Sequence, residues 1–176
     1  MNVLTTILAF AACFFVLIAV HEFGHYLAGW LGGIPARNMR IRMFVFPQRV
    51  DLRCEDRWVS PYDRELFLST AWGYLKTPPR FFLYTSGGLL LETLFAVVSV
   101  AVFMHFGHHA LAILVAISCL CIFLGIVLVL DLPVAWYRGH PVGDVSGLWA
   151  LAKLPTVVLM LVLLTVRSLL VWYVKT

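Results

Sequence analysis

Four long apolar runs constrain this chain more than any other feature of its sequence. A helix needs about 20 mostly apolar residues to cross the hydrocarbon core of a membrane. The composition agrees, because 62% of the residues are hydrophobic and only 12% are charged, whereas about a quarter of a typical soluble domain is charged. We therefore predict one all-α polytopic membrane domain, 1–176, with four transmembrane helices at about 3–31, 81–106, 110–132 and 156–174.

A polar insert, residues 32–80, separates the first two runs and holds most of the Lys and Arg residues. Because basic loops stay on the cytoplasmic side of a membrane, we predict a cytoplasmic insert and both termini on the opposite side. Alternation over 40–46 predicts a strand that stops at Pro47, with a hairpin partner at 50–54. Membrane orientation explains the net charge of +4, so we expect the lipid bilayer as a partner and no nucleic acid.

The first run ends in HEFGH, which places His21, Glu22 and His25 among apolar residues. Ionisable groups are expensive in hydrocarbon, and those found inside a membrane usually serve a function. Residues four apart lie on one face of a helix, so His21 and His25 can bind one metal ion. Glu22 lies beside His21 and can reach a water molecule on that metal, from which it would take a proton.

Two histidines do not complete a catalytic zinc site, which normally has three protein ligands and an open position for water. The predicted orientation places both HEFGH and the end of the third run near the cytoplasmic side of the membrane. Two carboxylates occur there, Asp131 and Asp144. The spacing alone leaves both open as the third ligand. His140, four residues before Asp144, is a further polar candidate near such a site.

The stretch HEFGHYLAGWLGGIPA resembles the metal-binding segment of the site-2 protease family of zinc-dependent intramembrane metalloproteases. The similarity is strong over residues 16–46 and looser over most of the remaining chain. It implies that His21 and His25 bind Zn²⁺ and that Glu22 is the catalytic base.

Two later regions are also similar to that family, in which an Asn-x-x-Pro stretch leads to an Asp-Gly whose Asp is the third ligand. LDLP, 130–133, resembles the first part with Asp131 in place of Asn, and Asp144 resembles the ligand although Val145 replaces the usual Gly. The resemblance thus implies Asp144 as third ligand, with Asp131 as the alternative. TPPRFFLYTSGGLLLETLFAV resembles the family's second core helix, in which Glu92 would line the site, orient a histidine or only pair within the helix bundle.

These features together predict a multi-pass integral membrane metalloendopeptidase with its active site toward the cytoplasmic side. It would hydrolyse a peptide bond in or near a transmembrane segment of a membrane-protein substrate. Two alternatives from other classes remain open. One is a catalytically inactive relative that binds or chaperones membrane proteins. The other is a metal or proton transporter, which would space its ionisable groups through the membrane.

Overall fold

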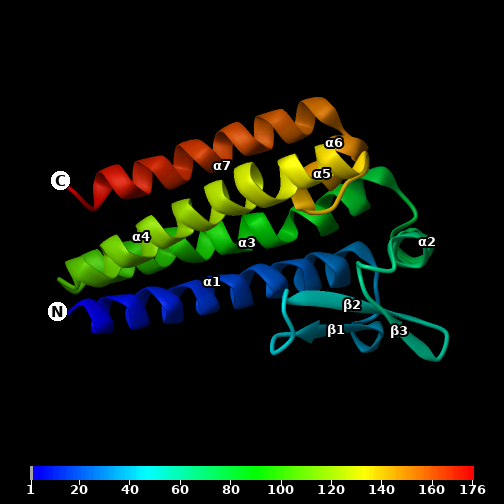
Figure 1. The fold of residues 1–176 in the computed structure, drawn as a ribbon, viewed down its shortest axis with the longest axis horizontal. Coiled ribbons are helices and arrows are strands. Elements are labelled where there is room, and N and C mark those ends of the chain that lie inside the picture. The colour runs from blue at the N-terminus through cyan, green and yellow to red at the C-terminus, as the bar shows by residue number, and fades with distance from the viewer. Residues whose placement is uncertain (1) are drawn as a thin grey trace. The chain divides into compact units, whose positions relative to one another are not determined.

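The computed structural model describes residues 2–176 and confirms the predicted helical class (Figure 1). Four stretches of helix within these residues are long and apolar enough to cross a membrane: α1 Val3–Gly32, α3 Pro78–His105, the continuous run His109–Arg138, and α7 Lys153–Tyr173. Their ends lie within a few residues of the predicted ones, except that the third run continues beyond 132.

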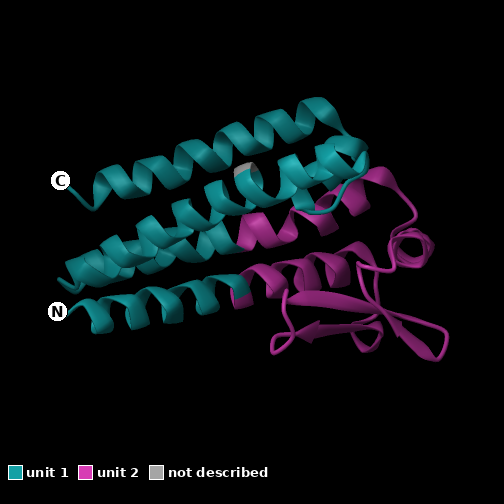
Figure 2. Cartoon of the chain, viewed as in Figure 1, with its two compact units in different colours: residues 1–18, 92–176 teal, residues 19–91 magenta. Residues whose placement is uncertain are grey.

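The described chain divides into two compact units (Figure 2). The first unit comprises residues up to Ile18 together with Glu92–Thr176, and the second comprises Ala19–Leu91. Both α1 and α3 contribute one part to each unit. The two units are described separately below.

Helices form the whole of the first unit. The third apolar run consists of α4 His109–Leu124, the π-helical segment η2 Gly125–Asp131, and α5 Leu132–Arg138. A turn then leads into the short helix α6 Asp144–Leu151, which is followed by α7. The core of this unit contains several small residues, which allow its helices to approach closely. The buried core residues are Leu17, Ala96, Val100, Ala112, Val115, Ala116, Cys119, Ile122 and Val174.

Large apolar side chains on the outside of the first unit are consistent with contact with lipid. On α7, Leu154, Leu161 and Leu169 are each more than half exposed. Soluble proteins rarely leave wide apolar surfaces in water, whereas a spanning helix must present such side chains to lipid.

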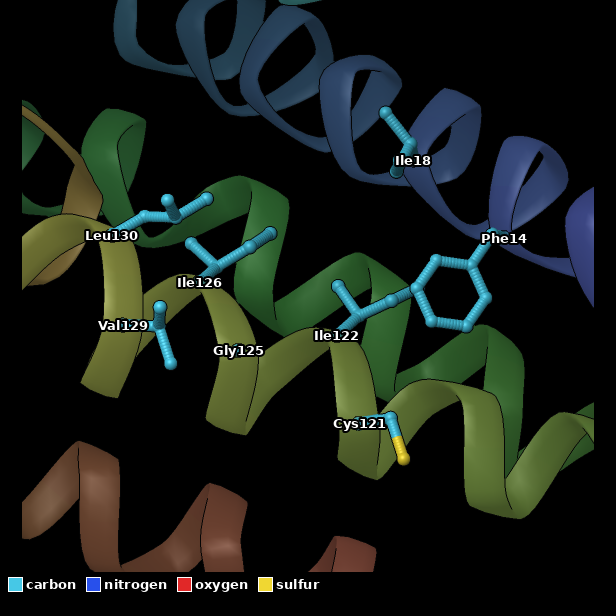
Figure 3. Close-up of a pocket in the computed structure, with 8 residues that line it drawn as sticks. All are labelled: Phe14, Ile18, Cys121, Ile122, Gly125, Ile126, Val129 and Leu130. Atoms are coloured by element: carbon cyan, nitrogen blue, oxygen red, sulfur yellow. The ribbon is translucent and has the colours of Figure 1, made fainter.

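An apolar pocket of about 340 Å³ also lies in the first unit, between the early part of α1 and the α4–η2 run (Figure 3). It contains no charged side chain, so it offers space but no catalytic group. Its lining residues are Phe14, Ile18, Cys121, Ile122, Gly125, Ile126, Val129 and Leu130.

A small antiparallel sheet and one amphipathic helix form the insert in the second unit. The sheet has the order β1 Met39–Arg42, β2 Arg49–Cys54, β3 Arg57–Val59. In the predicted hairpin Met39 pairs with Leu52 and Arg42 with Arg49, which confirms the pairing of the two segments. The strand predicted over 40–46 is shorter than expected, because the chain turns after Arg42.

Three elements of the insert were not predicted from the sequence: the short 3-10 helix η1 Ala36–Asn38, β3, and the helix α2 Arg64–Leu75. α2 buries Phe67, Ala71 and Leu75, which are four residues apart and therefore share one face of the helix. It packs against β2. The insert thus has its own small core beside the later part of α1 and the early part of α3.

A buried aspartate fixes the charged face of the sheet. Asp51 on β2 is only 3% exposed and accepts hydrogen bonds from the guanidinium groups of Arg40 and Arg49, each at about 3.0–3.1 Å. Arg40 also lies over the ring of Trp58, 4.4 Å from its centroid. These contacts keep two of the insert's cations in place.

Candidate metal centre

The two motif histidines lie together on the later part of α1, as their spacing predicts. His21 and His25 are 9% and 8% exposed, and their Nε2 atoms are 3.1 Å apart. Their rings meet edge to face with centroids 4.8 Å apart. Two imidazole nitrogens are therefore brought to one point inside the second unit.

The backbone of α3 determines which nitrogen of His25 faces this point. Nδ1 of His25 lies 2.9 Å from the carbonyl oxygen of Tyr84, which can only accept a hydrogen bond. Nδ1 must therefore carry the proton, which leaves the lone pair on Nε2. A metal-binding histidine is commonly held by such a bond from its other ring nitrogen to a carbonyl. When Nε2 of His21 is protonated, it can donate to His25 Nε2 across the 3.1 Å.

Glycine keeps the space in front of these nitrogens open. A Cβ atom placed on Gly88 of α3 would lie 2.6 Å from Nε2 of both His21 and His25. The backbones of the two helices meet nearby, since a Cβ on Gly87 would lie only 2.6 Å from the carbonyl oxygen of Gly24. Any larger residue at position 88 would occupy the place where a shared ligand of the two histidines must sit.

Glu22 is also buried, with 9% of its surface exposed. It follows His21 directly on α1 and so lies about a quarter-turn around the helix from the histidine pair. A buried carboxylate so far inside an apolar segment requires a specific role or partner. The three ionisable residues of HEFGH are thus all buried, whereas Phe23 between them is about half exposed.

The two aspartates belong to the first unit and have different environments. Asp144 is the first residue of α6 and is partly exposed. Asp131 ends η2, is 3% exposed, and accepts hydrogen bonds through Oδ2 from the backbone N–H groups of Val145 and Ser146 at 2.7 and 3.0 Å. Its Oδ1 is buried without a hydrogen-bond partner among residues 2–176.

Glu92 pairs with Arg167 in the core of the first unit. The Nη1 of Arg167 lies 3.2 Å from Glu92 Oε1, and the two side chains are 0% and 1% exposed. The thiol of Cys119 also contacts Glu92 Oε1, at 3.7 Å. This pairing gives Glu92 a structural reason for its burial, and sequence reasoning did not predict the partner.

The remaining histidines show no comparable clustering in the part of the chain that the structure describes. His140 lies in the turn between α5 and α6, partly exposed, with Nδ1 3.0 Å from the carbonyl oxygen of Pro141. His105, His108 and His109 are exposed where α3 passes into α4.

Two important contributors to the histidine cluster were missed by sequence reasoning: the Tyr84 carbonyl and the small residue at position 88. A backbone carbonyl leaves no sequence signal. The adjacent Gly87 and Gly88 inside an apolar helix were the available signal, because paired small residues often mark a close helix crossing. No family model, curated protein or solved structure matches the chain.

Proposed function

We propose that this protein is a zinc-dependent intramembrane endopeptidase similar to the site-2 proteases. The observation that carries the proposal is the pair of buried nitrogens of His21 and His25, 3.1 Å apart, in a helix apolar and long enough to cross a membrane. Structural cores rarely contain two adjacent histidines beside a carboxylate at such depth, because their burial is costly unless a ligand compensates it.

The donor set fits zinc. Nitrogen ligands bind Zn²⁺ at about 2.0–2.1 Å with tetrahedral geometry, which places two such nitrogens roughly 3.3 Å apart. His21 and His25 already have close to this separation. We propose Asp144 as the third ligand, because a carboxylate would complete a three-ligand set with the two histidines and the sequence resemblance implies this aspartate. Bound zinc would lower the pKa of water toward neutrality and polarise the peptide carbonyl.

Glu22 performs the proton transfers in this proposal. Its carboxylate takes a proton from the attacking water as the water oxygen bonds to the peptide carbonyl carbon. It then gives that proton to the amide nitrogen as the C–N bond breaks, which releases an amine and a carboxylic acid. The water needs no external base, because one carboxylate serves as base and then as acid.

The substrate would be a membrane protein whose chain is locally unwound at the site. A transmembrane helix uses its own carbonyl groups in internal hydrogen bonds, so an intact helix does not present a peptide bond for attack. The basic insert favours an orientation in which this chemistry lies toward the cytoplasmic side. The transporter alternative loses support from Glu92 and Arg167, since these two groups are paired with each other.

Glu22→Gln tests the proposal most directly. We expect the purified variant to retain as much zinc as the wild type, measured by elemental analysis, because Glu22 is not a ligand. His21→Ala and His25→Ala should lose the metal. Membranes containing the wild type should yield new peptide termini in terminal proteomics, and membranes containing Glu22→Gln should not.

Glu65→Gln, at an exposed position on α2, is the matched control and should behave as wild type in both assays. Equal cleavage products from wild type and Glu22→Gln would reject an enzyme of this kind and favour a binding or transport role. A wild-type protein without zinc would reject the metal site itself.

A further inference from the structure

We infer that Asp131 is a positioning residue, which sets the place of Asp144 by holding the start of α6, and that it is not itself a metal ligand. The inference rests on the proposed function in so far as Asp144 is taken as the third ligand. The contacts that carry it lie wholly within the first unit, between the end of η2 and the first turn of α6.

The first turn of every helix has N–H groups without partners inside the helix. A side chain at the residue before the helix normally accepts one of these bonds, but that residue is Gly143. Glycine has no side chain to accept such a bond, and Asp131, earlier in the sequence, does so instead. Its Oδ2 accepts hydrogen bonds from the backbone N–H groups of Val145 at 2.7 Å and Ser146 at 3.0 Å. A carboxylate at this place is also favoured by the positive end of the helix dipole.

Ser146 holds the other side of the same turn. Its hydroxyl oxygen accepts hydrogen bonds from the N–H groups of Val142 and Gly143 at 3.0 and 3.1 Å, and its Oγ lies 3.2 Å from the carbonyl oxygen of Gly143. Asp144 is therefore flanked by anchored backbone on both sides. Since a Cβ on Gly143 would lie 2.8 Å from the carboxyl carbon of Asp131, glycine is what allows this close approach.

The division of labour between the two aspartates follows from these bonds. Oδ2 of Asp131 already accepts hydrogen bonds from two backbone N–H groups, and metal binding through this oxygen would leave both without an acceptor. The other oxygen takes no hydrogen bond among residues 2–176. A single acceptor atom is therefore sufficient for the positioning role. An amide in place of the carboxylate keeps that atom, whereas an alanine removes it.

The test compares Asp131→Asn with Asp131→Ala in the full-length protein by hydrogen exchange and zinc titration. In Asp131→Ala, exchange at the amides of Val145 and Ser146 should rise by roughly tenfold, as expected from loss of a helix cap. Its zinc affinity should fall by roughly 10–100-fold, the range for residues that orient a ligand. Asp131→Asn should stay within about threefold of wild type in both measurements. The amides of α2 serve as the internal control.

The outcomes separate the two proposals. If Asp131→Asn loses zinc as severely as Asp131→Ala, Asp131 is a ligand and the inference is wrong. If Asp131→Ala leaves exchange at Val145 and Ser146 unchanged, the capping role is wrong whatever the metal does. If Asp131→Ala speeds exchange while zinc affinity stays at the wild-type value, the cap is real but does not position a ligand. If the wild type itself binds no zinc, the proposed function fails, and exchange still reports on the cap.

Discussion

Substitution of Arg167 should destabilise the protein more than any single surface change, because its charge is completely buried. Nε and Nη2 donate to Thr93 Oγ1 at 3.0 and 2.7 Å, while Nη1 donates to the Cys119 carbonyl at 2.9 Å and to Glu92 Oε1 at 3.2 Å. The guanidinium also lies 4.6 Å from the ring centroid of Phe123. One side chain of α7 is thereby joined to α3 and α4.

The expected loss of folding free energy depends on which buried charge each substitution leaves without a partner. Arg167→Met leaves the buried Glu92 carboxylate without its cation, and Glu92→Met leaves the buried guanidinium without its anion. Removing one partner of a buried ion pair typically costs about 3–5 kcal/mol of folding stability. The double variant leaves no buried charge. Its remaining losses are the hydrogen bonds of the Thr93 hydroxyl and of the Cys119 carbonyl and thiol. The Thr93 hydroxyl can turn to a carbonyl in its own helix. We expect the double variant to lose only about 1–2 kcal/mol, less than either single variant.

The assay is the free energy of unfolding in mixed micelles, from SDS titrations of the wild type, both single variants and the double variant. Arg64→Met, at an exposed position on α2, removes a cation of the same kind and should change stability by less than about 0.5 kcal/mol. The reasoning is refuted if the double variant costs as much as the sum of the two single variants, because the two charges would then act independently.

Two further predictions concern the second unit. Gly88→Ala should lower zinc affinity by at least about tenfold in a competition titration, because the methyl group needs the space in front of both histidine nitrogens. Gly125→Ala, where a Cβ meets no atom within 4 Å, should keep wild-type affinity, and equal effects of the two changes would contradict the steric explanation. Asp51→Leu should speed amide exchange across β1 and β2 by roughly tenfold or more, since it leaves Arg40 and Arg49 without their shared acceptor. Unchanged exchange there would show that the sheet does not depend on this ion cluster.

The membrane-length helices were predictable because a single local quantity, the length of an apolar run, determines them. Their ends were less predictable. α3 begins at Pro78 rather than at 81, since proline is favoured in the first turn, where its missing N–H is not needed. The third run continues past Pro133 to Arg138, and this proline lies where the π-helical segment η2 passes into α5.

In the insert, the periodicity of apolar residues predicted only part of the secondary structure. The hairpin was visible as alternation, but its first strand ends early at Arg42, before the apolar residues 43–46. α2 carries a usable signal, with Phe67, Ala71 and Leu75 at helical spacing, and it could have been found from the sequence. β3 has three residues and owes its existence to pairing with β2, which no local pattern reveals.

In the candidate site too, some features depend on residues close together in the sequence and others on contacts between distant residues. The i,i+4 relation of His21 and His25 is a property of one helix, so the sequence was enough to predict that they meet. The choice between Asp131 and Asp144 depends on bonds made across a turn, and spacing therefore left both possible. The hydrogen bonds show that one carboxylate oxygen of Asp131 holds the backbone at the start of α6. We therefore propose complementary tasks for the two aspartates: Asp131 holds the start of α6, and Asp144, at its first position, binds the metal.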